Sequence, residues 1–133
     1  MTAPTRTASC CCGQLKAVTT AEPIRVSVCH CLACQRRTGG VFASQARFPA
    51  SAVTIAGTSS TYVRVGDAGG RGTFHFCPTC GTTVYYVNQG SEDSVAIPVG
   101  AFADPDFPAP TVSVYEERMH AWVNMPADIE HIF

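Results

Sequence analysis

The sequence predicts a mainly β protein that forms one domain. Many short segments are rich in Val, Thr, Phe and Tyr and are bounded by Gly, Pro, Ser and Asp, which is typical of strands joined by turns. The chain has 133 residues, a usual length for a single domain. Its hydrophobic fraction is 46% and its charged fraction 14%, a composition that argues against disorder. We assign residues 1–133 to one domain and expect residues 1–8 to form a flexible N-terminal tail.

The expected elements follow one another along the chain. Residues 32–38 run out of a cysteine and stop at Gly39-Gly40, so one short helical turn is expected there. Residues 66–72, with four glycines, indicate a flexible hairpin tip or loop, and residues 104–110, with three prolines, an irregular connection. Alternation over residues 73–77 places Phe74 and Phe76 on one face. Strands are expected at residues 15–19, 23–28, 41–48, 52–55, 61–65, 73–76, 83–87, 94–99, 111–115 and 120–123.

The charge pattern excludes several classes of partner. The net charge is −1, and the nine lysines and arginines are spread along the chain. Because Arg36-Arg37 is the only adjacent basic pair, we expect neither nucleic acid nor a membrane surface as a partner. The first nine residues lack an apolar run, and no segment approaches the roughly 18 apolar residues of a membrane span. We therefore expect a cytoplasmic protein, in a reducing compartment where disulfides are rare.

All eight cysteines fall into three tight groups. Adjacent and next-but-one cysteines bridge each other poorly, whereas short spacings let two or three sulfurs point at one ion. The pattern therefore favours metal ligands over disulfides. Zinc is the expected metal, with one closed site of four ligands and one site that keeps a position open. The groups are Cys10-Cys11-Cys12, Cys29-His30-Cys31-Leu32-Ala33-Cys34 and Cys77-Pro78-Thr79-Cys80.

Ligand counting by itself leaves the pairing of the groups open. The segment 77–81 has the form of a zinc knuckle and needs two more sulfurs. Cys10 and Cys12 are the better candidates, because this choice leaves the middle group intact. Pairing of Cys10 and Cys12 with two members of the middle group is an alternative that spacing does not exclude. On an extended segment Cys11 points away from its neighbours, so we interpret it as a small buried or idle thiol.

The residues around the cysteines form a pattern that covers nearly the whole chain. The pattern consists of Cys10-x-Cys12-Gly13, Cys29-His30-Cys31-x-x-Cys34-x-Arg36-x-x-Gly39, Val41-Phe42, Cys77-x-x-Cys80-Gly81, Tyr85 and His120-Ala121-Trp122-Val123. It resembles the glutathione-dependent formaldehyde-activating enzyme family. The resemblance implies a mainly β, Mss4-like "β-tent" of short antiparallel sheets with zinc sites.

The resemblance also implies which thiols belong to which zinc ion. The outer cysteines correspond to a structural set, namely Cys10, Cys12, Cys77 and Cys80. The middle cysteines correspond to a labile or catalytic set, namely Cys29, Cys31 and Cys34. The implied activity is that of a carbon–sulfur lyase, which adds glutathione or a similar thiol to formaldehyde or another small aldehyde.

Several polar residues near the cysteines are further candidates. Arg36 and Arg37 are candidates for binding the glutathione carboxylates, against the plainer interpretation that they are surface charges on a short helix. The ring of His30 is expected to point away from zinc, in a supporting or core role. His75 is expected to be a satisfied strand histidine. His120 and Trp122 are expected on one strand face, as a core corner or a pocket wall.

Glu116-Glu117 is expected to be a solvated turn. The remaining aromatic residues are expected in the β core or at its rim, namely Phe42, Phe48, Tyr62, Phe74, Phe76, Tyr85 and Tyr86.

Three functional hypotheses follow from the sequence. The leading one is the thiol- and aldehyde-binding enzyme with zinc at Cys29, Cys31 and Cys34. The second is a non-catalytic zinc-binding protein-interaction module of the Mss4-like class. The third is a redox switch that uses the same three thiols without zinc, because clustered free thiols oxidise readily. Exposed edge strands are compatible with either a monomer or a homodimer.

Overall fold

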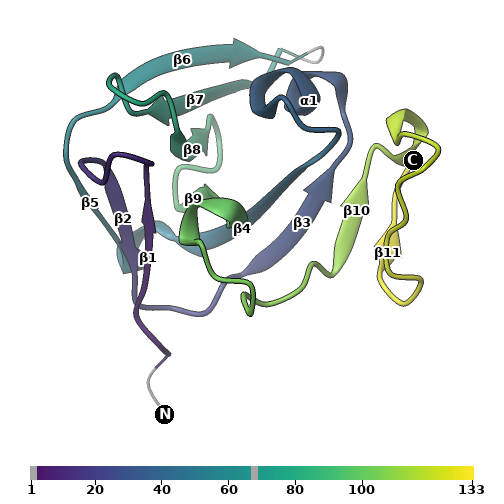
Figure 1. Ribbon diagram of the computed structural model, residues 1–133, viewed down its shortest axis with the longest axis horizontal. Coiled ribbons are helices and arrows are strands. Elements are labelled where there is room, and N and C mark those ends of the chain that lie inside the picture. Colours follow the sequence, from purple (N-terminus) through teal and green to yellow (C-terminus); the bar gives the residue numbers. More distant parts are fainter. Residues whose placement is uncertain (1–2, 67–68) are drawn as a thin grey trace.

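The computed structural model describes residues 3–66 and 69–133, and its strands form two sheets (Figure 1). The smaller sheet is antiparallel and contains β1 (Arg6–Ser9), β2 (Lys16–Thr19) and β5 (Val53–Ala56). The larger sheet has the order β11-β10-β3-β4-β9-β8-β7-β6. Its strands are β3 (Arg25–Cys29), β4 (Ala43–Pro49), β6 (Ser60–Val65), β7 (Arg71–Phe76), β8 (Thr83–Asn88), β9 (Ser94–Pro98), β10 (Val112–Val114) and β11 (Glu130–His131). The mainly β fold class is confirmed.

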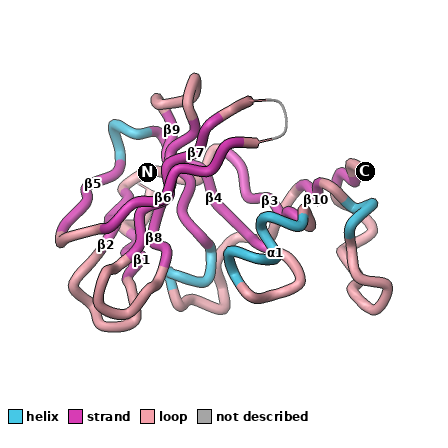
Figure 2. Tube along the Cα trace, turned by 90° about the horizontal axis from the view of Figure 1, so that it is seen from above, coloured by secondary structure: helices cyan, strands magenta, loops and turns pink. Residues whose placement is uncertain are grey.

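Little of the chain is helical, as Figure 2 shows. The α-helix α1 spans Leu32–Thr38, the range expected from the sequence. It begins after Cys31, whose Sγ accepts a hydrogen bond from the Cys34 N–H, and it ends at Gly39 in the left-handed conformation. Three short 3-10 turns follow, η1 (Ala50–Ala52), η2 (Val99–Phe102) and η3 (Glu116–Arg118). Among the described residues, no helix has the length and apolar character needed to cross a membrane.

The main core combines side chains from both sheets. Phe48 on β4 and Ile97 on β9 are fully buried and belong to one cluster with Ala8 on β1 and Ala17 on β2. Cross-strand pairing of Ala46 with Ile97 and of Phe48 with Val95 puts these side chains on one face of the larger sheet. Burial of a side chain such as Phe48 stabilises the fold by about 1.5–3 kcal/mol. The residues that alternate with them, such as Arg47 on β4, therefore face away from this core.

Most strand expectations are confirmed, with shifts of a few residues at the ends. The last one is wrong: residues 120–123 form a turn, closed by a hydrogen bond from the Val123 N–H to the His120 carbonyl. The segment has no partner strand, so alternation of apolar residues is not enough to make it extended. β1 and β11 were not expected, and both exist because of their pairing with β2 and β10.

The expected tail is wrong from Arg6 onward, because Arg6 begins β1 and Ala8 is fully buried. The hairpin between β6 and β7 is confirmed, and the irregular connection at 104–110 is also found. The flexibility expected for residues 66–72 falls partly on Asp67 and Ala68, which lie outside the described residues.

The larger sheet is mixed at one end, because β10 lies parallel to both β3 and β11. The other strand pairs of this sheet are antiparallel.

Candidate functional site

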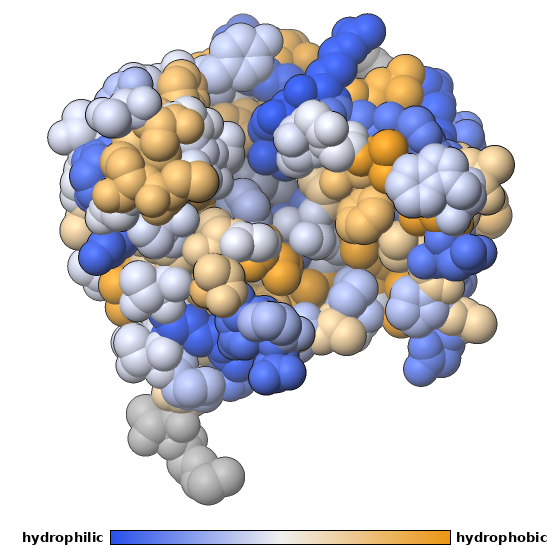
Figure 3. Space-filling view, in the orientation of Figure 1, coloured by the Kyte–Doolittle hydropathy of each residue, from blue (hydrophilic) through white to orange (hydrophobic). Residues whose placement is uncertain are grey.

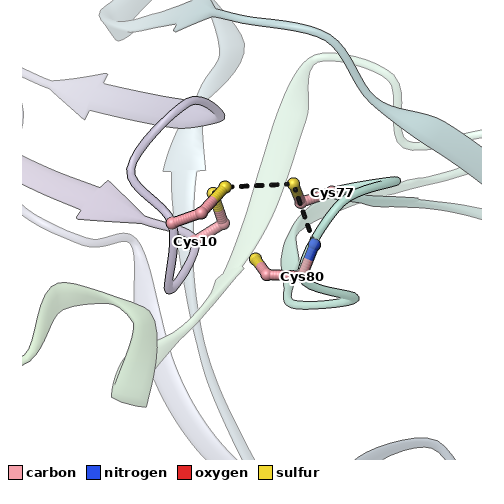
Figure 4. Close-up of side chains that lie close together, drawn as sticks. Cys10, Cys77 and Cys80 are labelled. Carbon is pink, nitrogen blue, oxygen red and sulfur yellow. Dashed lines mark hydrogen bonds between the residues drawn. The ribbon is translucent and has the colours of Figure 1, made fainter.

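Four cysteines from two distant connections meet in one cluster, which we call the four-cysteine cluster. Cys10 and Cys12 come from the β1–β2 connection, and Cys77 and Cys80 from the β7–β8 connection. Their sulfur atoms all lie within 4.8 Å of one another. The Sγ of Cys12 is 3.6 Å from that of Cys10 and 3.6 Å from that of Cys77. Figure 4 shows the side chains of Cys10, Cys77 and Cys80 converging from the two segments.

Local backbone structure aims these thiols at one point. The knuckle is held by hydrogen bonds from the N–H groups of Thr79 and Cys80 to Cys77 Sγ, at 3.4 and 3.5 Å. Gln14 Nε2 donates a further hydrogen bond to Cys77 Sγ at 3.0 Å. Each pair is followed by a glycine with positive φ, Gly13 at 85° and Gly81 at 81°, a conformation that favours glycine. The C-x-C-G and C-x-x-C-G motifs thus share one way of turning the chain.

The second cluster comes from one continuous segment, and we call it the three-cysteine cluster. Cys29 ends β3, Cys31 caps α1, and Cys34 lies in the first turn of α1; their sulfurs lie within 4.8 Å of one another. Hydrogen bonding to Cys34 and burial raise the pKa of Cys29. Hydrogen bonds from Cys29 and Cys31, together with the Arg37 guanidinium, outweigh burial and lower the pKa of Cys34. Negative charge is therefore favoured at the helix end of this cluster.

The three-cysteine cluster opens into a pocket of about 610 Å³, a size usual for small-molecule sites. All three of its cysteines line this pocket, whereas none of the four-cysteine cluster does. Arg37 of α1 also lines it, with its guanidinium 5.0 Å from the centre of the Phe74 ring and 5.5 Å from that of Tyr86. The two clusters therefore differ in access to a ligand, although both could hold metal ions.

The structure separates the predicted pair of arginines. Of these two residues, Arg37 lines the pocket with the cysteines and Arg36 does not. Arg36 is exposed and lines a neighbouring hollow with Tyr62 and Ala33. The glutathione-binding role expected for Arg36 and Arg37 stays a prediction.

The histidines lie outside both cysteine clusters. His30 is fully buried, its Nε2 hydrogen-bonds with Ser113 Oγ at 2.9 Å, and burial lowers its pKa. His75 hydrogen-bonds with Ser59 at 3.0 Å and stacks on Tyr85, as expected for a satisfied strand histidine.

Three other expectations require correction. His120 and Trp122 do not share a strand face, because they lie in a turn where Trp122 is 70% exposed. Glu116 is not solvated: its side chain is buried and accepts a hydrogen bond from His131 at 2.7 Å, whereas Glu117 is exposed. Cys11 is exposed, so the buried alternative is wrong, and it belongs to neither cluster, which agrees with the alternative of an idle thiol.

Sequence reasoning missed most of the charged residues of the pocket. Arg25 and Arg47 line it from β3 and β4, and Arg64 and Arg71 line it from the β6–β7 hairpin. One signal was present, since Arg25 stands four residues before Cys29 and alternation places both on one strand face. The other three arginines reach the pocket through strand pairing, which spacing along the chain does not reveal.

The fold and the clusters together define a β-rich protein with two sets of thiols able to hold metal ions. A family model described as "Glutathione-dependent formaldehyde-activating enzyme" matches residues 5–118, and the chain belongs to this family. A crystal structure of a Rhodobacter sphaeroides protein is similar, with 20% sequence identity, a TM-score of 0.57, and coverage of 74% of this chain and 91% of that one. This likeness shows the fold alone. No curated protein matches the chain.

Proposed function

We propose that the chain is a zinc-dependent carbon–sulfur lyase that adds a low-molecular-weight thiol, glutathione or a similar one, to formaldehyde or another small aldehyde. The observation that carries the proposal is the opening of the three-cysteine cluster into the 610 Å³ pocket. Family membership supports the thiol and aldehyde theme. We place this chemistry in the cytoplasm of the cell, in a monomer or homodimer.

The spacing of the thiols supports zinc as the metal. Zn–S bonds of about 2.3 Å give tetrahedral S–S separations of about 3.8 Å. The separations of 3.6 Å around Cys12 fit this value, and four thiolates form a closed structural site. Cys29, Cys31 and Cys34 supply only three thiolates, so the fourth position of a zinc ion there would be free for an incoming thiol. Zinc, when bound, supplies positive charge that lowers the pKa of that thiol.

The reaction itself is an addition that balances without another reactant. The thiol sulfur forms a bond to the aldehyde carbon, the C=O π bond breaks, and the thiol proton ends on the new hydroxyl oxygen. The chain's own groups hold the reactants in one place, which is the main requirement because formaldehyde is already electrophilic. Arg37 lies next to Cys34 and offsets the negative charge of the thiolates.

NMR exchange spectroscopy of glutathione with formaldehyde tests the proposal. The protein should raise the exchange rate above the uncatalysed rate, and Cys34→Ser should return it to that rate with the fold intact. Cys11→Ser is the matched control, because Cys11 is exposed and outside both clusters, and it should keep full activity. Full activity of Cys34→Ser would show that the site assignment is wrong.

The non-catalytic interaction module has one observation in its favour. β6 is an edge strand, and its residues Tyr62, Val63 and Val65 are exposed. The face drawn in Figure 3 gives the interaction module no further support, because its hydrophobic residues are interspersed with hydrophilic ones around a central hollow.

Metal analysis separates the enzyme from the interaction module. Two zinc ions per chain, one of them easily removed by a chelator, support the enzyme. One tightly held zinc ion and a metal-free three-cysteine cluster support the module instead.

A further inference from the structure

The strand β6 stands at one end of the larger sheet and presents a long open edge. With six residues, Ser60–Val65, it is the longest edge strand of the described chain, since β1 and β5 have four residues each and β11 has two. Its pairing with β7 runs along the whole strand without a register shift. Figure 1 draws β6 along the upper margin of the molecule. Proteins usually shorten, bulge or cover such an edge, because its N–H and C=O groups are a template for another strand.

The side chains of β6 suit pairing with a further strand. Tyr62, Val63 and Val65 are 63%, 45% and 55% exposed, and valine and tyrosine are favoured in strands. Arg64 is the only charged residue of the strand, which contains neither proline nor lysine. Proline and lysine are among the residues that protect an edge from pairing. β6 therefore lacks the usual protection along its whole length.

The hydrogen bonds of the β6–β7 hairpin show which backbone groups of β6 are directed to the open edge. The Gly66 N–H donates to the Gly70 carbonyl at 2.7 Å, and this pair continues the β6–β7 register. In an antiparallel ladder, hydrogen-bonded pairs alternate with pairs that are not hydrogen-bonded. The N–H and C=O groups of Arg64 and Tyr62 therefore point to β7. The residues that alternate with them direct their groups to the open edge, namely Thr61, Val63 and Val65.

The next ladder of the sheet gives the same alternation independently. The Gln89 N–H donates to the Arg71 carbonyl at 2.7 Å, and this pair continues the β7–β8 register. Arg71 thus bonds to β8, so its neighbour Gly72 must bond to β6. Gly72 is paired with Arg64, which agrees with the direction assigned to the Arg64 backbone groups.

We propose that β6 is the interface of a homodimer, in which the β6 strands of two copies pair antiparallel around a two-fold axis at Val63. A two-fold interface must be complementary to itself, and one strand paired antiparallel with its own copy meets this condition. The axis sets Val63 opposite itself and Thr61 opposite Val65 of the partner subunit. All three residues with edge-directed groups then form hydrogen-bonded pairs. The exposed side chains of Val63 and Val65 are also removed from water.

Side chains favour this register over its neighbours. Tyr62 and Arg64 point to the same face of the sheet, and an axis at Val63 sets each opposite the other across the interface. A guanidinium against an aromatic ring is favourable, and pairs that are not hydrogen-bonded bring side chains closest. An axis at Arg64 would instead put two guanidiniums opposite each other, which destabilises a sheet. An axis at Tyr62 would pair Val65 with Ser59, which lies outside the strand.

Sedimentation of the full chain over a range of concentrations tests the proposal. The mass should rise from that of one chain to that of two as the concentration increases. Val63→Pro should raise the dissociation constant of the dimer about tenfold or more, because it removes the N–H that each copy donates across the axis. The ladder with β7 is spared, since this N–H points away from β7. Val63→Thr keeps the N–H and the branched side chain, so as the matched control it should keep the dimer.

Two further variants test the register, and they also decide the matter if Val63→Pro does not fold. Tyr62→Arg sets like charges opposite each other and should weaken the dimer. Adding Arg64→Tyr to it exchanges the two residues, restores the unlike pairs and should recover the dimer.

Hydrogen exchange followed by NMR reads the same interface residue by residue. The amides of Thr61, Val63 and Val65 should become protected as the concentration rises, because only the dimer gives them a partner strand. The amides of Tyr62 and Arg64 should be protected at every concentration, because they bond to β7 within one copy.

Three outcomes would overturn the proposal. They are a chain that stays monomeric at about 1 mM, a dimer that folded Val63→Pro and Tyr62→Arg proteins both retain, and protection of the edge-directed amides that does not change with concentration. A monomer would leave the β6 edge to a different partner, as in the interaction module. The inference does not rest on the proposed function, and none of these measurements uses a thiol substrate or an aldehyde.

Discussion

The two cysteine clusters use the same side chain in different surroundings. The four-cysteine cluster joins two connections that are 65 residues apart, as measured from Cys12 to Cys77, and its polar neighbours are uncharged groups such as Gln14 and Thr82. The three-cysteine cluster comes from a single six-residue segment and lies beside Arg37. A metal that joins distant segments contributes to folding. A metal held by one segment at the wall of a pocket adds little to chain connectivity and is available to a ligand.

The largest expected effect is on the four-cysteine cluster. Cys77→Ser should remove a structural ligand and lower the free energy of unfolding by more than about 5 kcal/mol, enough to unfold a typical domain. Thermal melting followed by circular dichroism, with zinc content measured on the same sample, checks this. A Cys77→Ser protein that melts like the wild type would remove the distinction between the clusters.

The second effect should appear in activity rather than stability. Cys34→Ser should keep the melting temperature within a few degrees, because Cys29 and Cys34 lie only five positions apart and a metal held between them would close only a short loop. Thiol–aldehyde exchange should fall to the uncatalysed rate. Melting and exchange measurements are made in parallel on this variant and on Cys77→Ser. We expect Cys77→Ser to lose stability and Cys34→Ser to lose activity without losing stability. Loss of folding in both variants would mean that both clusters are structural.

A smaller effect is expected from the uncharged surroundings of the four-cysteine cluster. Gln14 donates hydrogen bonds to Cys77 Sγ and to the Thr58 carbonyl and accepts one from the Thr58 N–H. Gln14→Ala should therefore lower the free energy of unfolding by about 1–3 kcal/mol without changing aldehyde exchange. Gln89→Ala, at an exposed glutamine, is the control and should stay within about 0.5 kcal/mol of the wild type. Denaturant titration measures both variants.

The smallest effect concerns the edge of the sheet beside the three-cysteine cluster, where β10 pairs with β3 and with β11. Burial opposes ionisation of Glu116, but hydrogen bonds from His131 and Ser113 outweigh it and hold the pKa of Glu116 below 4.5. The hydrogen bond to Glu116 raises the pKa of His131 above 6.5.

The pH window follows from these two directions. A lowered carboxyl pKa contributes stability that is present above 4.5 and is lost as pH falls through the folded pKa. A raised histidine pKa contributes stability that is present below 6.5 and is lost as pH rises through the folded pKa. The pair should therefore stabilise the fold most between pH 4.5 and 6.5, and Glu116→Gln should flatten this maximum in melting temperature. Glu117→Gln, at an exposed residue, should leave the maximum unchanged.

Short-range features could be predicted from sequence because their causes are local. The helix at Leu32–Thr38 follows from a cap at Cys31 and a stop at Gly39, all within a few residues. The division of seven cysteines into two clusters was expected from resemblance, and the geometry brings the same two groups together. The short strand β1 was missed because its residues lack a strong strand pattern and become extended only by pairing with β2.

The sequence by itself determined the three cysteine groups, the alternation of most strands and the helix at Leu32–Thr38, since these depend on spacings of two to four residues. Only the tertiary structure decided that Arg47 faces Arg25, that Arg64 reaches the same pocket and that Arg36 does not. It also decided that Glu116 is buried against His131. These outcomes depend on strand register between distant segments, where a shift of one residue would turn each side chain to the opposite face. The charge of the pocket, and with it the choice of ligand, is therefore a property of the folded sheet.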